Sequence, residues 1–170
     1  MANVKFEDFR PEVKAALNQT TIAWLHEWGS EVQAQAARNC KMDDNGRLRG
    51  SYQNIVDEQK GVATIGSPLE SVYWEEFGTG AYADTSKNGG KRGRAGWWVY
   101  VEDYNGQSQS TVYNSRDEAE AVASSMRAEG FKAHATNGRR PAYTLEKSFE
   151  TVRPKAVSDL QDKLKERMEK

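Results

Sequence analysis

The chain has 170 residues and a formal net charge of −1, with 37% hydrophobic and 29% charged residues. This length suits one domain with room for a small insert, and the near-neutral charge excludes a general attraction to nucleic acid or anionic membranes. The one cysteine, Cys40, excludes an intrachain disulfide and favours folding in a reducing cytoplasm. With no apolar run of the roughly 20 residues that a membrane span needs and no signal-peptide core, we expect a soluble protein.

Residues 8–40 are predicted to form one long helix. Pro11 suits the first helical turn, where its missing N–H is not needed. Apolar residues recur every three or four positions and form a stripe that includes Trp24 and Trp28, whereas Gly29 weakens the helix. We expect the two indoles to pack against a sheet, with a contact between subunits as the alternative.

A turn and a hairpin follow this helix. Residues 43–46, Asp-Asp-Asn-Gly, have the composition of a turn and lack the spacing and the closing Glu of a calcium loop. Residues 51–57 and 61–66 are predicted strands joined by a tight turn.

The segment 71–80 reads SVYWEEFGTG and combines three aromatic residues, two carboxylates and two glycines. We predict a short helical turn that ends at the glycines, because glycine adopts positive φ readily. The neighbouring carboxylates Glu75 and Glu76 point about 100° apart on a helix, so they do not converge as a general acid and base. The motif residues are Tyr73, Trp74, Glu76, Phe77, Gly78, Thr79 and Gly80.

The segment 87–96, KNGGKRGRAG, holds four basic residues among four glycines. We predict a mobile loop, since glycine resists ordering and like charges repel. A contact with DNA phosphate or with a neighbouring subunit is the functional interpretation, and a solvated loop that becomes ordered only in an assembly is the alternative. The basic residues are Lys87, Lys91, Arg92 and Arg94.

Residues 95–136 are predicted to form a small ββαβ insert. The expected strands are 96–102, 110–113 and 131–135, and Ser115 with Glu118 forms a capping box at the start of the helix. The rhythm Ser-x-x-Glu-Ala followed by Gly-Phe-x-Ala loosely resembles half of a sporulation-related peptidoglycan-binding repeat. That resemblance implies glycan binding, whereas a unit that only packs or mediates contacts is the alternative.

Residues 145–170 are predicted to form an amphipathic C-terminal helix, with a kink or a break near Val152 caused by Pro154. We expect this helix to pack antiparallel to the N-terminal one. The predicted fold is α+β, with both long helices on a mostly antiparallel sheet. Residues 1–94 and 137–170 are expected to form the core domain, and 95–136 the insert.

Catalytic, cofactor and metal sites are not expected. His26 and His134 have no Cys or carboxylate at metal-ligand spacing, and Cys40 is not at a helix N-terminus. No nucleophile elbow, phosphate-binding loop or dinucleotide fingerprint is present. We therefore expect a protein that is not an enzyme and binds no cofactor.

The order of several segments resembles the tail-completion, or head–tail joining, proteins of long-tailed double-stranded-DNA phages, similar to gene product ten of lambda-like coliphages. The resemblance covers residues 5–86 and 138–168. It is carried by DDNGRLRGS at 43–51, VATIGS at 62–67, the motif at 71–80, and Arg-Pro-Ala-Tyr at 140–143 before the last helix.

This resemblance implies a virion protein that folds in the host cytoplasm, caps the tail tube as a hexameric ring and joins it to the head. The implied partners are other copies of the chain, the head-completion or connector protein and the tail tube protein, without any membrane. Glu76 would have a structural part, and the four basic loop residues would face the DNA path or a neighbouring subunit. The alternative is a module that binds a glycan or peptide through Trp97, Trp98, Tyr100 and Tyr113 of segment 96–136.

Overall fold

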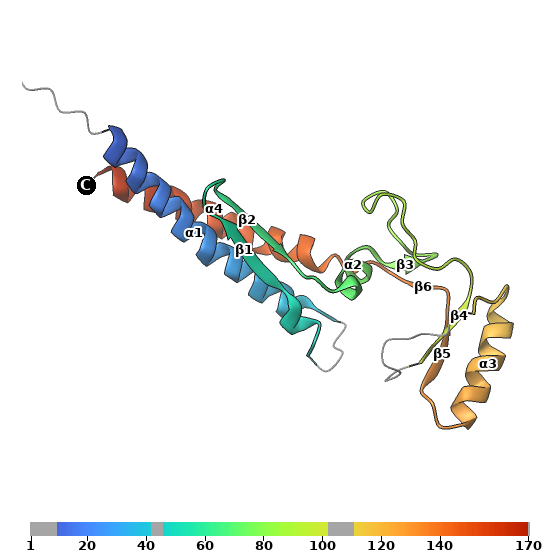
Figure 1. Cartoon of the computed structure of the whole chain (residues 1–170). Coiled ribbons are helices and arrows are strands. Elements are labelled where there is room, and N and C mark those ends of the chain that lie inside the picture. Colours follow the sequence, from blue (N-terminus) through green and yellow to red (C-terminus); the bar gives the residue numbers. More distant parts are fainter. Residues whose placement is uncertain (1–9, 42–45, 102–110, 170) are drawn as a thin grey trace, which may run out of the picture. The chain divides into compact units, whose positions relative to one another are not determined.

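The computed structural model describes residues 10–41, 46–101 and 111–169 (Figure 1). These residues form an α+β fold with two long helices, two shorter ones and three antiparallel strand pairs, β1–β2, β3–β6 and β4–β5. The predicted fold class is confirmed, although separate pairs take the place of one sheet. The chain forms two compact units, one from residues 10–68 with 144–169 and the other from residues 69–143.

These units divide the chain at other positions than the boundaries expected at 94/95 and 136/137. Strand β3, Thr79–Gly80, pairs with strand β6, Gly138–Arg139. Because this pairing joins segment 69–94 to segment 137–143, both belong to the same unit as the insert rather than to the unit of the long helices.

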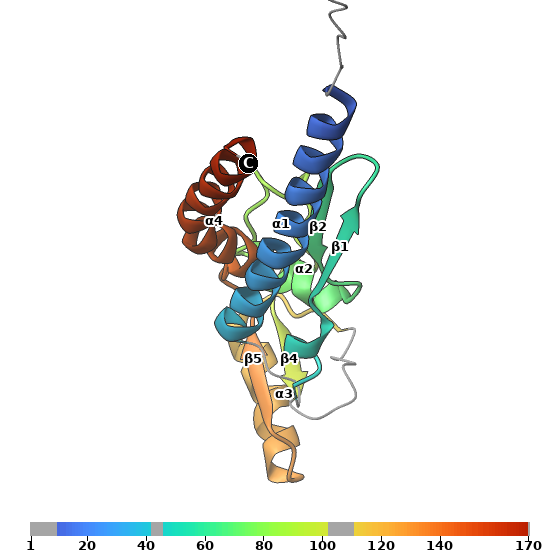
Figure 2. The same cartoon turned by 90° about the vertical axis from the view of Figure 1, so that its left-hand side faces the viewer.

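In the first unit, α1 (Arg10–Asn39) and α4 (Thr144–Met168) run antiparallel, as expected (Figures 1 and 2). We call the interface between these two helices the seam. Both indoles of α1 donate hydrogen bonds across it, Trp24 Nε1 to the Ala156 carbonyl and Trp28 Nε1 to Asp159 Oδ2, each over 2.8 Å. The buried residues Val32, Val152 and Ala156 lie between the helices, with Trp24, Trp28 and Ile65 packed against them. Core packing of the two indoles is therefore confirmed, but their main partner is helix α4 rather than the expected sheet, of which only Ile65 joins the cluster.

The predicted hairpin is confirmed as β1 (Gln53–Asp57) and β2 (Val62–Gly66), preceded by a 3₁₀ turn at Arg49–Ser51. The antiparallel register places Asn54 opposite Ile65 and Ile55 opposite Thr64. Ile65 packs against the helix seam, whereas Ile55 is 63% exposed on the other face. The hairpin thus covers α1 with one face only.

Helix α4 passes through Pro154 without interruption, so the alternative of a break near Val152 is wrong. Proline removes one backbone donor and disturbs the preceding turn of a helix. Val152 and Ala156, on either side of the proline, are both buried in the seam with α1. This packing and the hydrogen bond from Trp24 hold the two halves of α4 on one partner.

The second unit contains α2 (Glu70–Phe77), β3, β4 (Trp98–Val101), α3 (Arg116–Ala128), β5 (Ala133–Thr136) and β6. Helix α3 packs on one face of the β4–β5 pair, and the core between them is made of Val99, Val101, Ala119, Ala123 and Ala133.

The predicted ββαβ order of the insert needs one correction. Of the strand expected at 110–113, the described residues 111–113 form only an isolated bridge between Tyr113 and Trp97. Residues 102–110, which include the end of the first expected strand and the start of the second, lie outside the described part. The predicted N-cap is confirmed, because Ser115 Oγ accepts from the Glu118 N–H. The return bond of the capping box differs: Glu118 Oε2 accepts from the N–H of Asn114, one residue before the cap.

Candidate functional site

The motif 71–80 forms helix α2 and the strand that follows it. The helix ends at Gly78, which has φ of 73° and donates its N–H to the Trp74 carbonyl over 2.9 Å. The ring of Tyr73 meets the rings of Trp74 and Phe77 edge-on, each at a centroid distance of 5.0 Å. The predicted aromatic helix ended by a left-handed glycine is confirmed.

The two glycines of this motif allow two backbones to meet closely. A Cβ atom on Gly78 would lie 2.5 Å from the Arg139 carbonyl oxygen, and one on Gly80 only 2.0 Å from that of Asn137. Thr79 Oγ1 also accepts a hydrogen bond from the Arg139 N–H over 3.1 Å. The end of α2 is therefore fixed to a segment about sixty residues further along the chain.

The two carboxylates of α2 face the interior of their unit. Glu75 is fully buried and Glu76 is 7% exposed. Their backbone carbonyls accept from the N–H groups of Ala142, over 2.8 Å, and Tyr143, over 3.3 Å. This placement favours a structural part for Glu76 over contact with a substrate.

The basic loop between β3 and β4, predicted to be mobile, is attached to the motif by hydrogen bonds. Tyr73 donates its hydroxyl to the Asn88 carbonyl over 2.9 Å, and the Gly80 N–H donates to the Arg92 carbonyl over 2.7 Å. The buried Asn88 side chain in turn donates to the Lys91 carbonyl over 2.6 Å. These bonds fix the loop at its turn and near its end.

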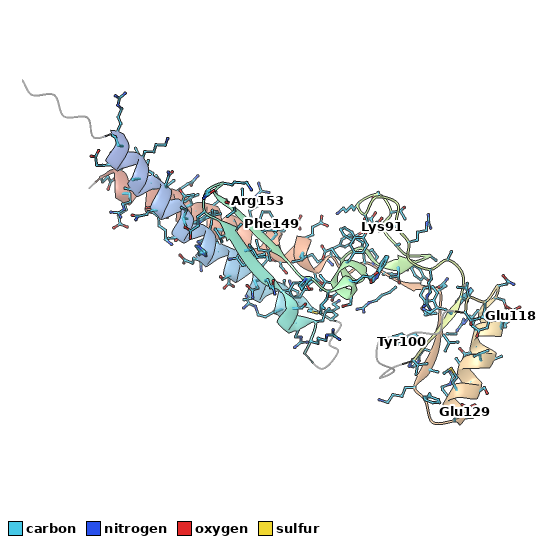
Figure 3. The ribbon with its side chains drawn as sticks, viewed as in Figure 1. Lys91, Tyr100, Glu118, Glu129, Phe149 and Arg153 are labelled. Atoms are coloured by element: carbon cyan, nitrogen blue, oxygen red, sulfur yellow. The ribbon has the colours of Figure 1, made fainter. Side chains whose placement is uncertain are left out.

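Aromatic rings hold the cationic groups of this region. Lys87 Nζ lies 4.8 Å from the Tyr143 ring centre, Lys91 Nζ lies 5.5 Å from that of Tyr73, and the Arg94 guanidinium lies 6.0 Å from that of Trp98. Such contacts stabilise a cation by about 0.5–1 kcal/mol at exposed sites. Lys91 is exposed at the surface (Figure 3). Arg92 is exposed as well.

Asp84 organises the start of the loop, a role that was not predicted. Its Oδ1 accepts from the Ser86 N–H over 3.1 Å and from the Ser86 hydroxyl, and its Oδ2 accepts from the Tyr143 hydroxyl over 2.8 Å. The hydrogen bonds from Ser86, and then from Tyr143, lower the pKa of Asp84 below its ordinary value of 3.8. Tyr143 itself has positive φ, 52°. An isolated Asp in a polar segment gave no signal for this role.

Two further arginines lie beside the motif. Arg139 is in β6, opposite Thr79, and the Arg140 guanidinium lies 5.5 Å from the ring centre of Tyr82. Their pairing with the motif depends on a two-residue strand that no periodicity in the sequence could reveal.

The aromatic residues of the insert do not form one exposed group. Trp98 is only 8% exposed, and Trp97 and Tyr113 pack against the core between α3 and the β4–β5 pair. Tyr100 is 49% exposed (Figure 3). This arrangement favours packing over a glycan- or peptide-binding platform.

Of the histidines and the cysteine, His26 and Cys40 belong to the first unit, and His134 lies on β5 of the second. His26 Nε2 lies 3.2 Å from Glu58 Oε1 at the surface, His134 is exposed on β5, and Cys40 is buried at 2% exposure. Within residues 10–41, 46–101 and 111–169, no cluster of three or more His, Cys, Asp or Glu residues could hold a metal ion.

Comparisons with known proteins bring no relative: no protein-family model, no curated protein and no solved structure matches this chain. In the part of the chain that the structure describes, every helix is too short or too polar to cross a membrane.

Proposed function

We propose that this chain is a structural protein of a phage virion that completes the tail and joins it to the head. It would cap the tail tube as a hexameric ring and present a surface to the head-completion or connector protein. In this role it forms no covalent intermediate and needs no cofactor. The ring and its contacts with partners would form through complementary protein surfaces.

One observation carries this proposal. Two of the four segments that carry the resemblance, 71–80 and 140–143, lie far apart in the sequence and meet in the structure. Gly78 meets Arg139 and Pro141, and the Glu75 carbonyl accepts from Ala142. If a family shares these two segments, their contact gives a physical reason, because a change in one segment would disturb the other. The contact therefore supports the resemblance.

The buried carboxylates support the non-enzymatic part of the proposal. A general acid or base must reach the proton that it transfers, within about 3 Å of a substrate atom or through one water. Glu75 is fully buried, and the backbones of Glu75 and Glu76 bind the segment before α4. Both residues therefore act as parts of the scaffold.

The basic loop would face the DNA path or a neighbouring subunit in the ring. Its exposed cations stand on a loop that is fixed to the motif, so the same scaffold that forms the signature also positions Lys91 and Arg92. Folding would occur in the host cytoplasm, and the finished protein would reside in the virion.

The proposal is tested by complementation. A lysate of a phage with a nonsense mutation in this gene is mixed with the purified chain, and the titre of infectious particles is counted. We expect the parent chain to restore the titre and a variant with Lys87, Lys91, Arg92 and Arg94 replaced by Ser to restore much less. Full activity of that variant would remove the loop from the mechanism, and failure of the parent chain would count against the joining role.

A further inference from the structure

We propose that the second unit binds duplex DNA through its phosphates, using cations from both strand segments around β3. We define the basic cluster as Lys87, Lys91, Arg92, Arg94, Arg139 and Arg140. This inference deepens the proposed function, on which its biological setting rests, by assigning a partner and by adding Arg139 and Arg140 to the site.

The charge pattern of the sequence is the first observation. Residues 85–101 contain four Lys or Arg residues and no Asp or Glu, and residues 130–143 contain three Lys or Arg residues and again no carboxylate. The net charge of −1 does not reveal these two segments, because acidic residues elsewhere in the chain balance their positive charge. Each alone is too short to form an extended anion-binding surface.

The fold joins the two segments around β3. Gly80 donates its N–H to the Arg92 carbonyl, Ala81 donates to the Asn137 carbonyl, and Gly80 pairs with Gly138. Pairing of β4 with β5 joins the same two segments a second time, from Trp98 opposite Thr136 to Val101 opposite Ala133. The basic loop and the two arginines are therefore neighbours.

The carboxylates that the structure describes near the cluster are buried or accept hydrogen bonds from other groups. Glu75 and Glu76 are buried, Asp84 is engaged by Ser86 and Tyr143, and Glu70 accepts from the Trp74 indole over 3.2 Å. By contrast, Lys87, Lys91, Arg92 and Arg140 are all exposed.

The aromatic rings indicate which form of DNA fits. Proteins that bind single strands stack bases on open aromatic faces. Here the faces of Tyr73, Tyr82 and Tyr143 each carry a cation, and Trp98 is buried beneath Arg94. The rings hold cations instead of bases, which suits the backbone of a duplex and gives no sequence preference.

The test is a fluorescence-anisotropy titration of the purified full chain with a labelled duplex of mixed sequence at several salt concentrations. Each phosphate contact contributes about −0.9 to the slope of log K against log salt, so we expect a slope of about −4 to −5 for the cluster. Replacement of Lys87, Lys91, Arg92 and Arg94 by Gln should reduce its magnitude by about 3 to 4. An Arg140→Gln variant should reduce it by about 0.9.

A matched control distinguishes the effect of the basic cluster on DNA binding from the effect of the net charge of the chain. Lys14, Arg47, Lys165 and Arg167 are exposed cations of the other unit, and their replacement by Gln changes the charge of the chain equally. This control should bind like the parent, and circular dichroism with thermal melting should show that all variants fold. Equal losses in the control and the cluster variant would overturn the proposal, as would unchanged binding by the cluster variant.

Two competitors complete the test. Tighter binding of an equal-length single strand would contradict the duplex assignment. Binding of poly-glutamate without binding of the duplex would overturn it in favour of an acidic protein partner. Absence of DNA binding in a chain that still restores phage titre would refute this inference alone, whereas DNA binding by a chain that restores no titre would refute the joining role alone.

Discussion

The indole Nε1 of Trp28 donates a hydrogen bond of 2.8 Å to Oδ2 of Asp159, which connects α1 to α4. Lys163 Nζ lies 2.9 Å from the same carboxylate oxygen and 2.6 Å from Glu27 Oε2 on α1. The hydrogen bond from Trp28, and then that from Lys163, lowers the pKa of Asp159 below its ordinary value of 3.8. A polar bridge therefore accompanies the apolar seam between the two long helices.

This bridge makes the stability of the first unit sensitive to acid. A folded-state pKa below 3.8 means that the bridge stabilises the fold above this pH, and that the contribution is lost as the pH falls through the folded-state pKa. We expect Asp159→Asn to lower the free energy of unfolding at neutral pH and to differ less from the parent in acid. Denaturant titrations of both chains, from neutral pH to below the folded-state pKa of Asp159, measure the difference in the free energy of unfolding. A constant difference at all pH values would contradict this explanation.

Gly29 on α1 and Asn54 on β1 form a close contact that reverses the usual effect of a Gly→Ala change. In a helix interior this change is worth about 1 kcal/mol of added stability. Here the new Cβ would lie 2.4 Å from Asn54 Oδ1, and Asn54 Nδ2 donates to the His26 carbonyl over 3.3 Å. We expect Gly29→Ala to destabilise the parent because Asn54 must move.

The same substitution in an Asn54→Ala background is the matched control. With the amide removed, Gly29→Ala should stabilise the chain by up to about 1 kcal/mol through helix propensity alone. Thermal denaturation of the four chains in this double-mutant cycle gives the coupling. Additive effects of the two substitutions would show that the contact does not matter.

Gly80 in β3 is expected to tolerate no side chain. It has φ of 60°, and an added Cβ would lie 2.0 Å from the Asn137 carbonyl oxygen, which belongs to the backbone and cannot rotate away. We expect Gly80→Ala to destabilise the second unit by about 3 kcal/mol or more, through strain and loss of the β3–β6 pairing. Limited proteolysis near the basic loop, together with thermal melting, measures the effect.

Gly50 provides the comparison, since an added Cβ there meets nothing within 4 Å and φ is not positive. Gly50→Ala should leave stability within about 0.5 kcal/mol of the parent. If Gly80→Ala behaved like Gly50→Ala, the close approach of β3 and segment 137–139 would be refuted.

The capping box of α3 gives a prediction for the insert. Ser115 Oγ accepts from the Glu118 N–H over 3.2 Å, and Glu118 lies in the first turn of the helix (Figure 3). Loss of an N-cap hydroxyl typically reduces stability by about 1 kcal/mol. We expect Ser115→Ala to do so, Ser115→Asp to retain most of the stability, and hydrogen exchange in α3 to increase in the alanine variant only. Equal exchange in both variants would count against the cap.

Local patterns explain which parts of the fold the sequence could predict. The stripe of α1, the hairpin around its tight turn, the capping box at Ser115 and the glycine end of α2 each depend on residues close in sequence. Helix α4 is the exception, because packing against Trp24 and Val32 outweighs the local effect of Pro154.

The candidate site depended on contacts that local patterns do not encode. The glycines and cations of 87–96 predicted a mobile loop. They did not indicate that Tyr73 and Gly80, which precede the loop in the sequence, form hydrogen bonds with its backbone. Arg139 and Arg140 reach the motif through a two-residue strand pair, and Asp84 meets Tyr143 across 59 positions. Hydrogen bonds between distant residues with no periodicity leave no local trace in a single sequence.

Electron microscopy of an induced lysate in which this gene carries a nonsense mutation tests the central claim most directly. We expect DNA-filled heads beside unattached tails, because the proposed ring, which would cap the tail and receive the head, is missing. Expression of the parent chain from a plasmid should restore joined particles. Complete, infectious particles without this chain would contradict the proposed role.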